Sequence, residues 1–187
     1  MPARLIAGGA AAALCLAVVM QIADPPRLIV LYNPSASAPV GWYKINANGV
    51  IERDVMVAAF APDDARNLAD ERGYLPHHVP LIKTVWATGG EKICSENGVV
   101  RAPNRPDIYA LREDGLGREL PSWSGCITLT MDEVFLVSTD VQTSFDSRYF
   151  GPVHLENVLG TVTFIGPKPE QTGVQVMQTG WARVERK

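Results

Sequence analysis

The chain has 187 residues, of which 47% are hydrophobic, enough for one packed domain and an additional apolar segment. Its formal net charge is -3 at pH 7, and it has no cluster of Lys and Arg that would indicate a nucleic-acid partner. The three cysteines lack the spacing of a zinc site, so we expect no metal and no other cofactor.

The apolar segment comes first, because residues 5–22 carry no charge. As a helix at ~1.5 Å per residue, this run would almost span the ~30 Å hydrocarbon core of a bilayer. We therefore expect a single-pass anchor over residues 1–26, with Arg4 and the amino terminus in the cytoplasm. A cleaved signal peptide is the alternative, although Gln21-Ile22-Ala23-Asp24-Pro25 offers no clear cleavage site.

Two serines then stand two residues apart in Asn33-Pro34-Ser35-Ala36-Ser37-Ala38-Pro39-Val40-Gly41. In an extended backbone Ser35 and Ser37 would point to the same side, and the prolines would restrict the backbone around them. Two hydroxyls would then face one site. On composition alone, the stretch is more typical of a linker between an anchor and a domain.

The segment 27–166 is expected to be one mainly β domain. Strands are predicted where β-branched and aromatic residues gather: 27–32, 41–45, 54–60, 81–86, 133–138 and 158–165. Pro62 and Gly73 delimit a short helix over 62–72, and residues 142–153 are predicted as a polar loop. We expect the polar residues 167–187 to form a C-terminal tail.

Cys94 and Cys126 enclose a run of turns and short strands, predicted as a β insertion over about residues 92–130. Two buried thiols are one interpretation. A disulfide is favoured if the domain lies outside the cytoplasm.

Lys83 lies in the apolar run Leu81-Ile82-Lys83-Thr84-Val85-Trp86, on the same strand face as Leu81 and Val85. Burial there would lower the pKa of its amine. A lysine that protects an edge strand from aggregation is the alternative. His77 and His78 are interpreted as surface-loop residues, since no third metal ligand is apparent.

A serine nucleophile requires a base. The histidines lie in polar contexts, and the chain has neither a Gly-x-Ser-x-Gly nor a Ser-x-x-Lys motif. A serine and a lysine on different strands remain, a known form of the nucleophile–base pair.

These residues carry a resemblance to a known family. The set Ser35-x-Ser37-x-Pro39-x-Gly41, Leu81-Ile82-Lys83-Thr84-Val85 and Ser144-x-Asp146-Ser147-Arg148 resembles the type I signal peptidases, in the family order. Gly117-Arg118-Glu119-Leu120-Pro121, with Trp123 and Cys126, is similar to the conjugative-transfer branch, the TraF peptidases. The resemblance implies a signal-peptidase-like β fold.

The resemblance also implies roles. Ser37 falls on the nucleophile and Lys83 on the general base, while Ser35 and the Ser37 N–H fall on the oxyanion hole. Ser144 matches a serine that orients the lysine. Asp146 and Arg148 match a pair that supports the active-site loop; a surface ion pair worth at most ~1 kcal/mol is the alternative.

One departure concerns Ser138-Thr139-Asp140, which stands where general signal peptidases carry Gly-Asp-Asn, and Asp140 receives no role. The implied function is a membrane-anchored serine endopeptidase in the periplasm that matures a conjugative pilin precursor. Its partners would be exported precursors, the inner membrane and conjugative transfer machinery. The alternatives are a housekeeping leader peptidase and a non-catalytic periplasmic binding module of a secretion system.

Overall fold

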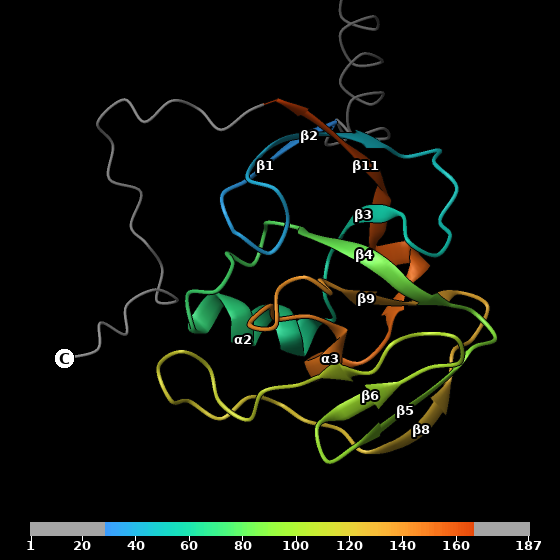
Figure 1. The fold of residues 1–187 in the computed structure, drawn as a ribbon. Coiled ribbons are helices and arrows are strands. Elements are labelled where there is room, and N and C mark those ends of the chain that lie inside the picture. Colours follow the sequence, from blue (N-terminus) through green and yellow to red (C-terminus); the bar gives the residue numbers. More distant parts are fainter. Residues whose placement is uncertain (1–28, 167–187) are drawn as a thin grey trace, which may run out of the picture.

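The computed structural model describes residues 29–166, which fold into two antiparallel sheets with short helices between their strands (Figure 1). The larger sheet has the strand order β1-β2-β11-β3-β4-β9-β10, and the smaller has the order β7-β6-β5-β8. The strands of the larger sheet are β1 (Val30–Asn33), β2 (Gly41–Asn46), β3 (Met56–Ala59), β4 (Leu81–Thr88), β9 (Glu133–Val137), β10 (Val153–His154) and β11 (Val158–Gly166). Those of the smaller sheet are β5 (Lys92–Glu96), β6 (Val99–Arg101), β7 (Ile108–Tyr109) and β8 (Gly125–Thr128). The expected mainly β architecture is confirmed.

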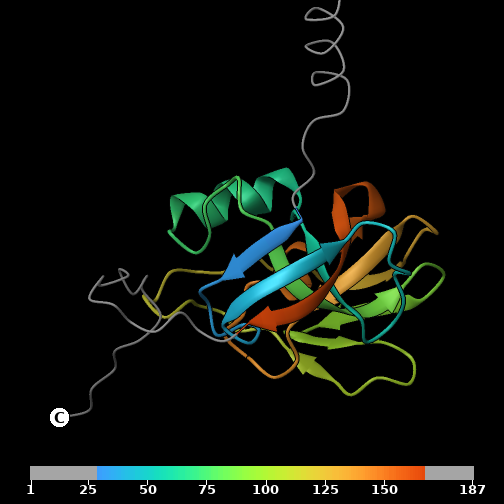
Figure 2. The same ribbon diagram turned by 90° about the horizontal axis from the view of Figure 1, so that it is seen from above.

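The last strand, β11, lies in the interior of the larger sheet, between β2 and β3 (Figure 2). The consecutive strands β2 and β3 are therefore not paired with each other. A turn follows β2, where the N–H of Gly49 donates to the carbonyl of Asn46 at 3.1 Å. The following residues lead to β3 on the far side of β11.

Gly41 begins β2 at a point where no side chain fits. Its φ is +152°, and a Cβ there would lie 2.5 Å from the Gly166 carbonyl oxygen and 2.5 Å from the Phe164 ring. The glycine thus lets the serine-bearing segment enter β2 in close contact with β11. This steric requirement explains the glycine that closes the Ser35-x-Ser37-x-Pro39-x-Gly41 motif.

The smaller sheet lies within the segment predicted as a β insertion. Cys94 and Cys126 are directly opposite in the β5–β8 ladder and form a disulfide. The disulfide interpretation is confirmed, and the interpretation as two thiols is wrong. Apolar side chains from both sheets, among them Trp86, Phe135 and Val100, form one shared core.

The expected helix is present as α2 (Asp63–Glu71), with Pro62 at its N-cap and Gly73 after its end.

The expectation of a polar loop over 142–153 is wrong. That segment contains the helical turn α3 (Ser147–Phe150), and β10 begins at its end; a single 3₁₀ turn (Leu155–Asn157) follows β10. Asp146, Ser147 and Arg148 are buried there, because they bond to one another or to backbone groups rather than to water.

The predicted anchor over 1–26 and tail over 167–187 lie outside the described residues. Within residues 29–166, no helix is both long enough and apolar enough to cross a membrane.

Candidate functional site

The serine stretch forms a tight turn between β1 and β2. Ser35 and Ser37 are brought together in this turn, with their Oγ atoms 2.9 Å apart. The expectation that an extended backbone aligns the two hydroxyls is therefore wrong, although they do face one site. Ser37 is half-buried and Ser35 is exposed, so both hydroxyls lie at the surface of the domain.

Asn33, the last residue of β1, organises this turn. Its Nδ2 donates to the backbone carbonyls of Ser35 at 2.9 Å, Ala38 at 3.0 Å and Pro39 at 3.2 Å. Its Oδ1 accepts from the N–H of Ser35 at 3.1 Å and from the Ser35 hydroxyl at 2.9 Å. Because that bond uses the single proton of the Ser35 hydroxyl, Ser37 is the donor in the contact between the two serines.

Sequence reasoning gave Asn33 no role. The available signal was an asparagine directly before Pro-x, since asparagine side chains commonly bond backbone groups two residues further on.

Replacing Asn33 with alanine is expected to lower kcat/KM for peptide cleavage by about 10- to 100-fold, because a misplacement of the reacting atoms by ~1 Å has an effect of this size. The free energy of unfolding should fall by only about 1 to 3 kcal/mol, since the freed backbone groups are partly solvated. The matched control is Asn46→Ala, which removes an exposed asparagine that bonds only the N–H of Asn48. If both variants retain full activity, Asn33 does not position the serines.

Lys83 lies on β4 in the interior of the larger sheet, between β3 and β9, and is 3% exposed. The interpretation as an edge-strand lysine is therefore wrong. Val57 pairs with it across β3, and Leu81 and Val85 flank it on its own strand, all buried. Burial lowers the pKa of Lys83 to about 8, so about a tenth of the amine is neutral at pH 7, far more than for an ordinary lysine.

Asp146 and Arg148 form a buried ion pair next to this lysine, with side chains that are 0% and 3% exposed. The Nε of Arg148 donates to Asp146 Oδ1 at 2.8 Å, and its Nη2 donates to Oδ2 at 2.8 Å. The guanidinium also donates to three carbonyls, those of Tyr109, Val141 and Ser144. The interpretation as a surface pair is wrong, because the pair holds the segment 141–148 together from within.

The ion pair acts on the Lys83 pKa in both directions: the Asp146 carboxylate raises it and the Arg148 guanidinium lowers it, while burial remains the largest cause. No acidic residue is near Lys83 in sequence, so the fold supplies this carboxylate. Its charge is largely neutralised by Arg148, and the lysine therefore keeps its lowered pKa.

The expected hydrogen bonds of Lys83 with Ser37 and with Ser144 are not formed in the part of the chain that the structure describes. Within residues 29–166 no hydrogen bond joins Ser37 to Lys83, and the buried hydroxyl of Ser144 has no partner. The two halves of the candidate dyad do lie on a common framework, because Ala38, next to Ser37, packs in the same apolar cluster as Ile82, next to Lys83. The orientation of Lys83 by Ser144 remains a prediction.

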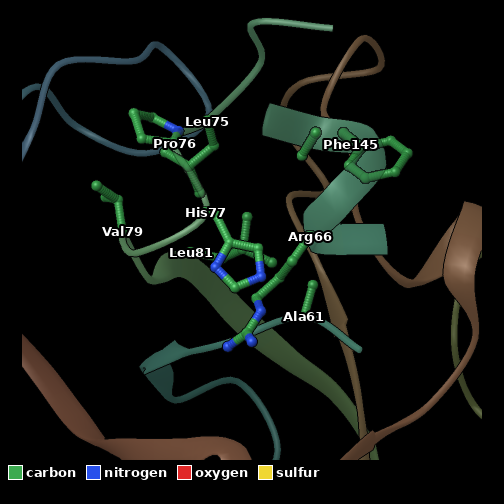
Figure 3. Close-up of a pocket in the computed structure, with 9 residues that line it drawn as sticks. Ala61, Arg66, Leu75, Pro76, His77, Val79, Leu81 and Phe145 are labelled. Atoms are coloured by element: carbon green, nitrogen blue, oxygen red, sulfur yellow. The ribbon is translucent and has the colours of Figure 1, made fainter. Parts of the chain in front are cut away.

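The domain also has an apolar hollow, lined by Ala61, Leu75, Val79, Leu81 and Phe145 (Figure 3). Arg66 and His77 contribute the polar part of its lining. Two of its lining residues are near candidate site residues in the sequence: Leu81 is two residues before Lys83 on β4, and Phe145 directly follows Ser144.

His78 and Asp140 are both exposed. Within the described part of the chain, no three residues of the types that bind metals are grouped as a metal site.

The Gly117-Arg118-Glu119-Leu120-Pro121 motif connects the insertion to the site. Arg118 Nε donates to the buried carboxylate of Asp114 at 2.6 Å, and its guanidinium lies 5.3 Å from the centre of the Tyr74 ring. Tyr74 also donates to Asp114 and packs against Phe145, which is next to Ser144. The motif therefore connects residues 112–120 to the active-site segment, a role that sequence reasoning missed because Tyr74 is 40 positions from Asp114 in the sequence.

Three comparisons identify relatives of the chain. Residues 3–166 match the family model described as "Signal peptidase, peptidase S26". The chain is 31% identical over 170 residues to a plasmid transfer protein TraF of Escherichia coli, covering 85% of this chain and 92% of that protein. It is 37% identical over 143 residues to a probable conjugal transfer protein TraF of Sinorhizobium fredii (strain NBRC 101917 / NGR234), covering 68% of this chain and 72% of that protein.

Among solved structures, a signal peptidase I from Enterococcus faecalis V583 aligns with 60% of this chain and 96% of its own. The sequence identity is 20% and the TM-score is 0.36, a value too low to support an argument about the fold.

Proposed function

This chain belongs to the peptidase S26 family of signal peptidases, and from that premise we propose that it is a membrane-anchored serine endopeptidase acting on exported precursors. The observation that carries the proposal is the burial of Lys83 on an interior strand, which lowers its pKa to about 8. An amine with this pKa can accept a proton near neutral pH, whereas an ordinary lysine with a pKa of ~10.4 cannot.

In the proposed reaction Ser37 Oγ attacks the scissile carbonyl while Lys83 Nζ takes the hydroxyl proton. The resulting oxyanion accepts hydrogen bonds from the Ser37 N–H and the Ser35 hydroxyl. Collapse of this intermediate breaks the peptide bond, and the leaving amine takes the proton back from Lys83. Water then attacks the acyl group on Ser37 while Lys83 takes its proton, and the bond between the acyl carbon and Ser37 Oγ breaks as Oγ takes that proton from Lys83. For the Ser35 hydroxyl to donate to the oxyanion, its hydrogen bond to Asn33 Oδ1 must first break.

The substrate is proposed to bind as an extended strand along the first residues of β4. The β4–β9 ladder begins at Thr84, and its register continues to Ser138 opposite Lys83, so Leu81 and Ile82 are the residues of β4 paired on one side only, with β3. A peptide added along the other side would pass between this edge and the serine turn, a known mode of peptide recognition. Cleavage is expected after small side chains.

The relatives named as plasmid and conjugal transfer proteins favour a conjugative pilin precursor as the substrate and the transfer machinery as the context. The proposed location is the outer face of the inner membrane, with the N-terminal segment as the anchor. Cys94–Cys126 supports an extracytoplasmic location, because disulfides persist in oxidising compartments.

Co-expression of the full chain with a candidate pilin precursor tests this function. Wild type should yield mature product, seen as a shift in mass of the precursor, and Ser37→Ala should yield none. Thr139→Ala, an exposed substitution, serves as the control. A non-catalytic binding module predicts equal processing with and without Ser37, and that result would refute the endopeptidase. Cleavage of general secretory precursors in preference to the pilin would favour a housekeeping leader peptidase.

A further inference from the structure

Ser138 lies beside the candidate base. It directly follows β9, whose Val137 and Leu136 pair with Thr84 and Val85 of β4. Continuing this antiparallel register by one residue places Ser138 opposite Lys83. Side chains directly opposite in an antiparallel pair lie on the same face, with Cβ atoms ~4.5 to 5.5 Å apart.

The ion pair fixes the position of Ser138. Its N–H donates to Asp146 Oδ2 at 3.1 Å, and Ser138 is 6% exposed. Asp146 is also the carboxylate that raises the pKa of Lys83, so one side chain connects Ser138 to the surroundings of the amine. The residues facing the amine from the neighbouring strands, Val57 on β3 and Leu136 on β9, are apolar.

The hydroxyl of Ser138 is buried and, within residues 29–166, has no hydrogen-bond partner. The Ser144 hydroxyl is likewise buried and, within the same residues, has no hydrogen-bond partner. An unpaired buried hydroxyl is destabilising, and rotation about one bond is enough to redirect it.

We propose that Ser138 is a positioning residue, whose hydroxyl hydrogen-bonds the Lys83 amine and directs it toward Ser37. This inference rests on the proposed function of Lys83 as the base. The Ser138 hydroxyl accepts a hydrogen bond from the Lys83 amine on the β9 side. The Ser144 hydroxyl accepts one on the side of the segment before α3. Together they fix an amine that would otherwise rotate among apolar side chains. The charged groups near this amine are Asp146 and Arg148, and neither is replaced in the test.

The test uses the purified full chain in detergent micelles and an internally quenched peptide with alanine on the acyl side of the scissile bond. Ser138→Ala should lower kcat by about two- to tenfold with little change in KM, the effect of losing one hydrogen bond of ordinary strength. The acidic limb of the pH profile should move to lower pH by several tenths of a unit, because a hydroxyl acceptor favours the charged amine. Ser138→Thr, which keeps the hydroxyl, should restore both values toward wild type.

Two controls separate positioning from stability. Thr139→Ala should leave kcat and the pH profile unchanged. Ser147→Ala removes a buried hydroxyl that accepts from the Leu136 N–H at 3.0 Å, and should lower the melting temperature without moving the acidic limb. Wild-type kcat and an unmoved limb in Ser138→Ala would overturn the inference, as would a change in melting temperature alone. Failure of the proposed function is distinguishable, because then wild type and Ser37→Ala would cleave the peptide equally.

Discussion

Replacing Lys83 with methionine is expected to abolish peptide cleavage and, at the same time, to stabilise the protein. Loss of a catalytic base that acts as a unit with its nucleophile typically lowers turnover by ~10⁴-fold or more. Burial lowers the pKa of Lys83 from 10.5 to about 8, which corresponds to a cost of roughly 3 kcal/mol for keeping the charged amine inside the fold. Methionine has a similar length and no charge, so this cost disappears. At pH 7 the melting temperature should rise by roughly 6 to 12 °C.

The pH dependence of unfolding identifies the cause of this stabilisation. Well below pH 8 Lys83 is protonated in both the folded and the unfolded chain, and the cost is fully present. Between about pH 8 and 10.5 the folded protein releases the proton while the unfolded chain retains it, so wild-type stability rises with pH. The advantage of Lys83→Met should therefore shrink across this window in denaturant titrations. An inactive variant that is less stable than wild type at pH 7 would contradict the account.

Replacing Asp146 with alanine is expected to have the largest cost in stability. The side chain is fully buried and accepts from the Arg148 guanidinium, the Arg148 N–H and the Ser138 N–H. Its removal leaves the Arg148 charge buried without a carboxylate, a change that typically costs about 3 to 5 kcal/mol. Cleavage should be lost as well, because Ser138, Ser144 and the segment before α3 lose their common support. Thermal or denaturant unfolding and the peptide assay measure the two effects.

The matched control is Asp107→Ala. Asp107 forms an ion pair with Arg101 on the smaller sheet, where the two side chains are 40% and 49% exposed. An exposed pair of this kind contributes at most about 1 kcal/mol, so this variant should remain nearly as stable as wild type and fully active. Equal losses in the two variants would mean that burial does not set the importance of the Asp146–Arg148 pair.

Patterns that depend on local sequence predicted most of the fold. Periodicity and turn residues were sufficient for α2, for the strand that carries Lys83 and for the β character of the insertion, because each is encoded within a few positions. The position of β11 between β2 and β3 was not predictable in this way, since strand pairing depends on contacts across the whole chain.

The candidate site also combines features that the local sequence predicts with features that only the fold determines. The apolar neighbours of Lys83 correctly predicted a buried amine with a lowered pKa. The segment around Asp146 looked like a solvated loop because its residues are polar, but burial of polar groups depends on partners that only the fold brings together. Asn33 and Arg118 were missed for another reason. Both have bonding partners only four or five positions away, but composition does not indicate which backbone carbonyl or side chain a polar group bonds.

The central claim is that Ser37 attacks with neutral Lys83 as its base, and the pH dependence of kcat/KM for the quenched peptide tests it most directly. The account predicts a rate that rises with pH and reaches half of its maximum near pH 8, as Lys83 loses its proton. A flat profile between pH 6 and 9 would contradict a lysine base, and a midpoint near ~6.5 would indicate a histidine instead.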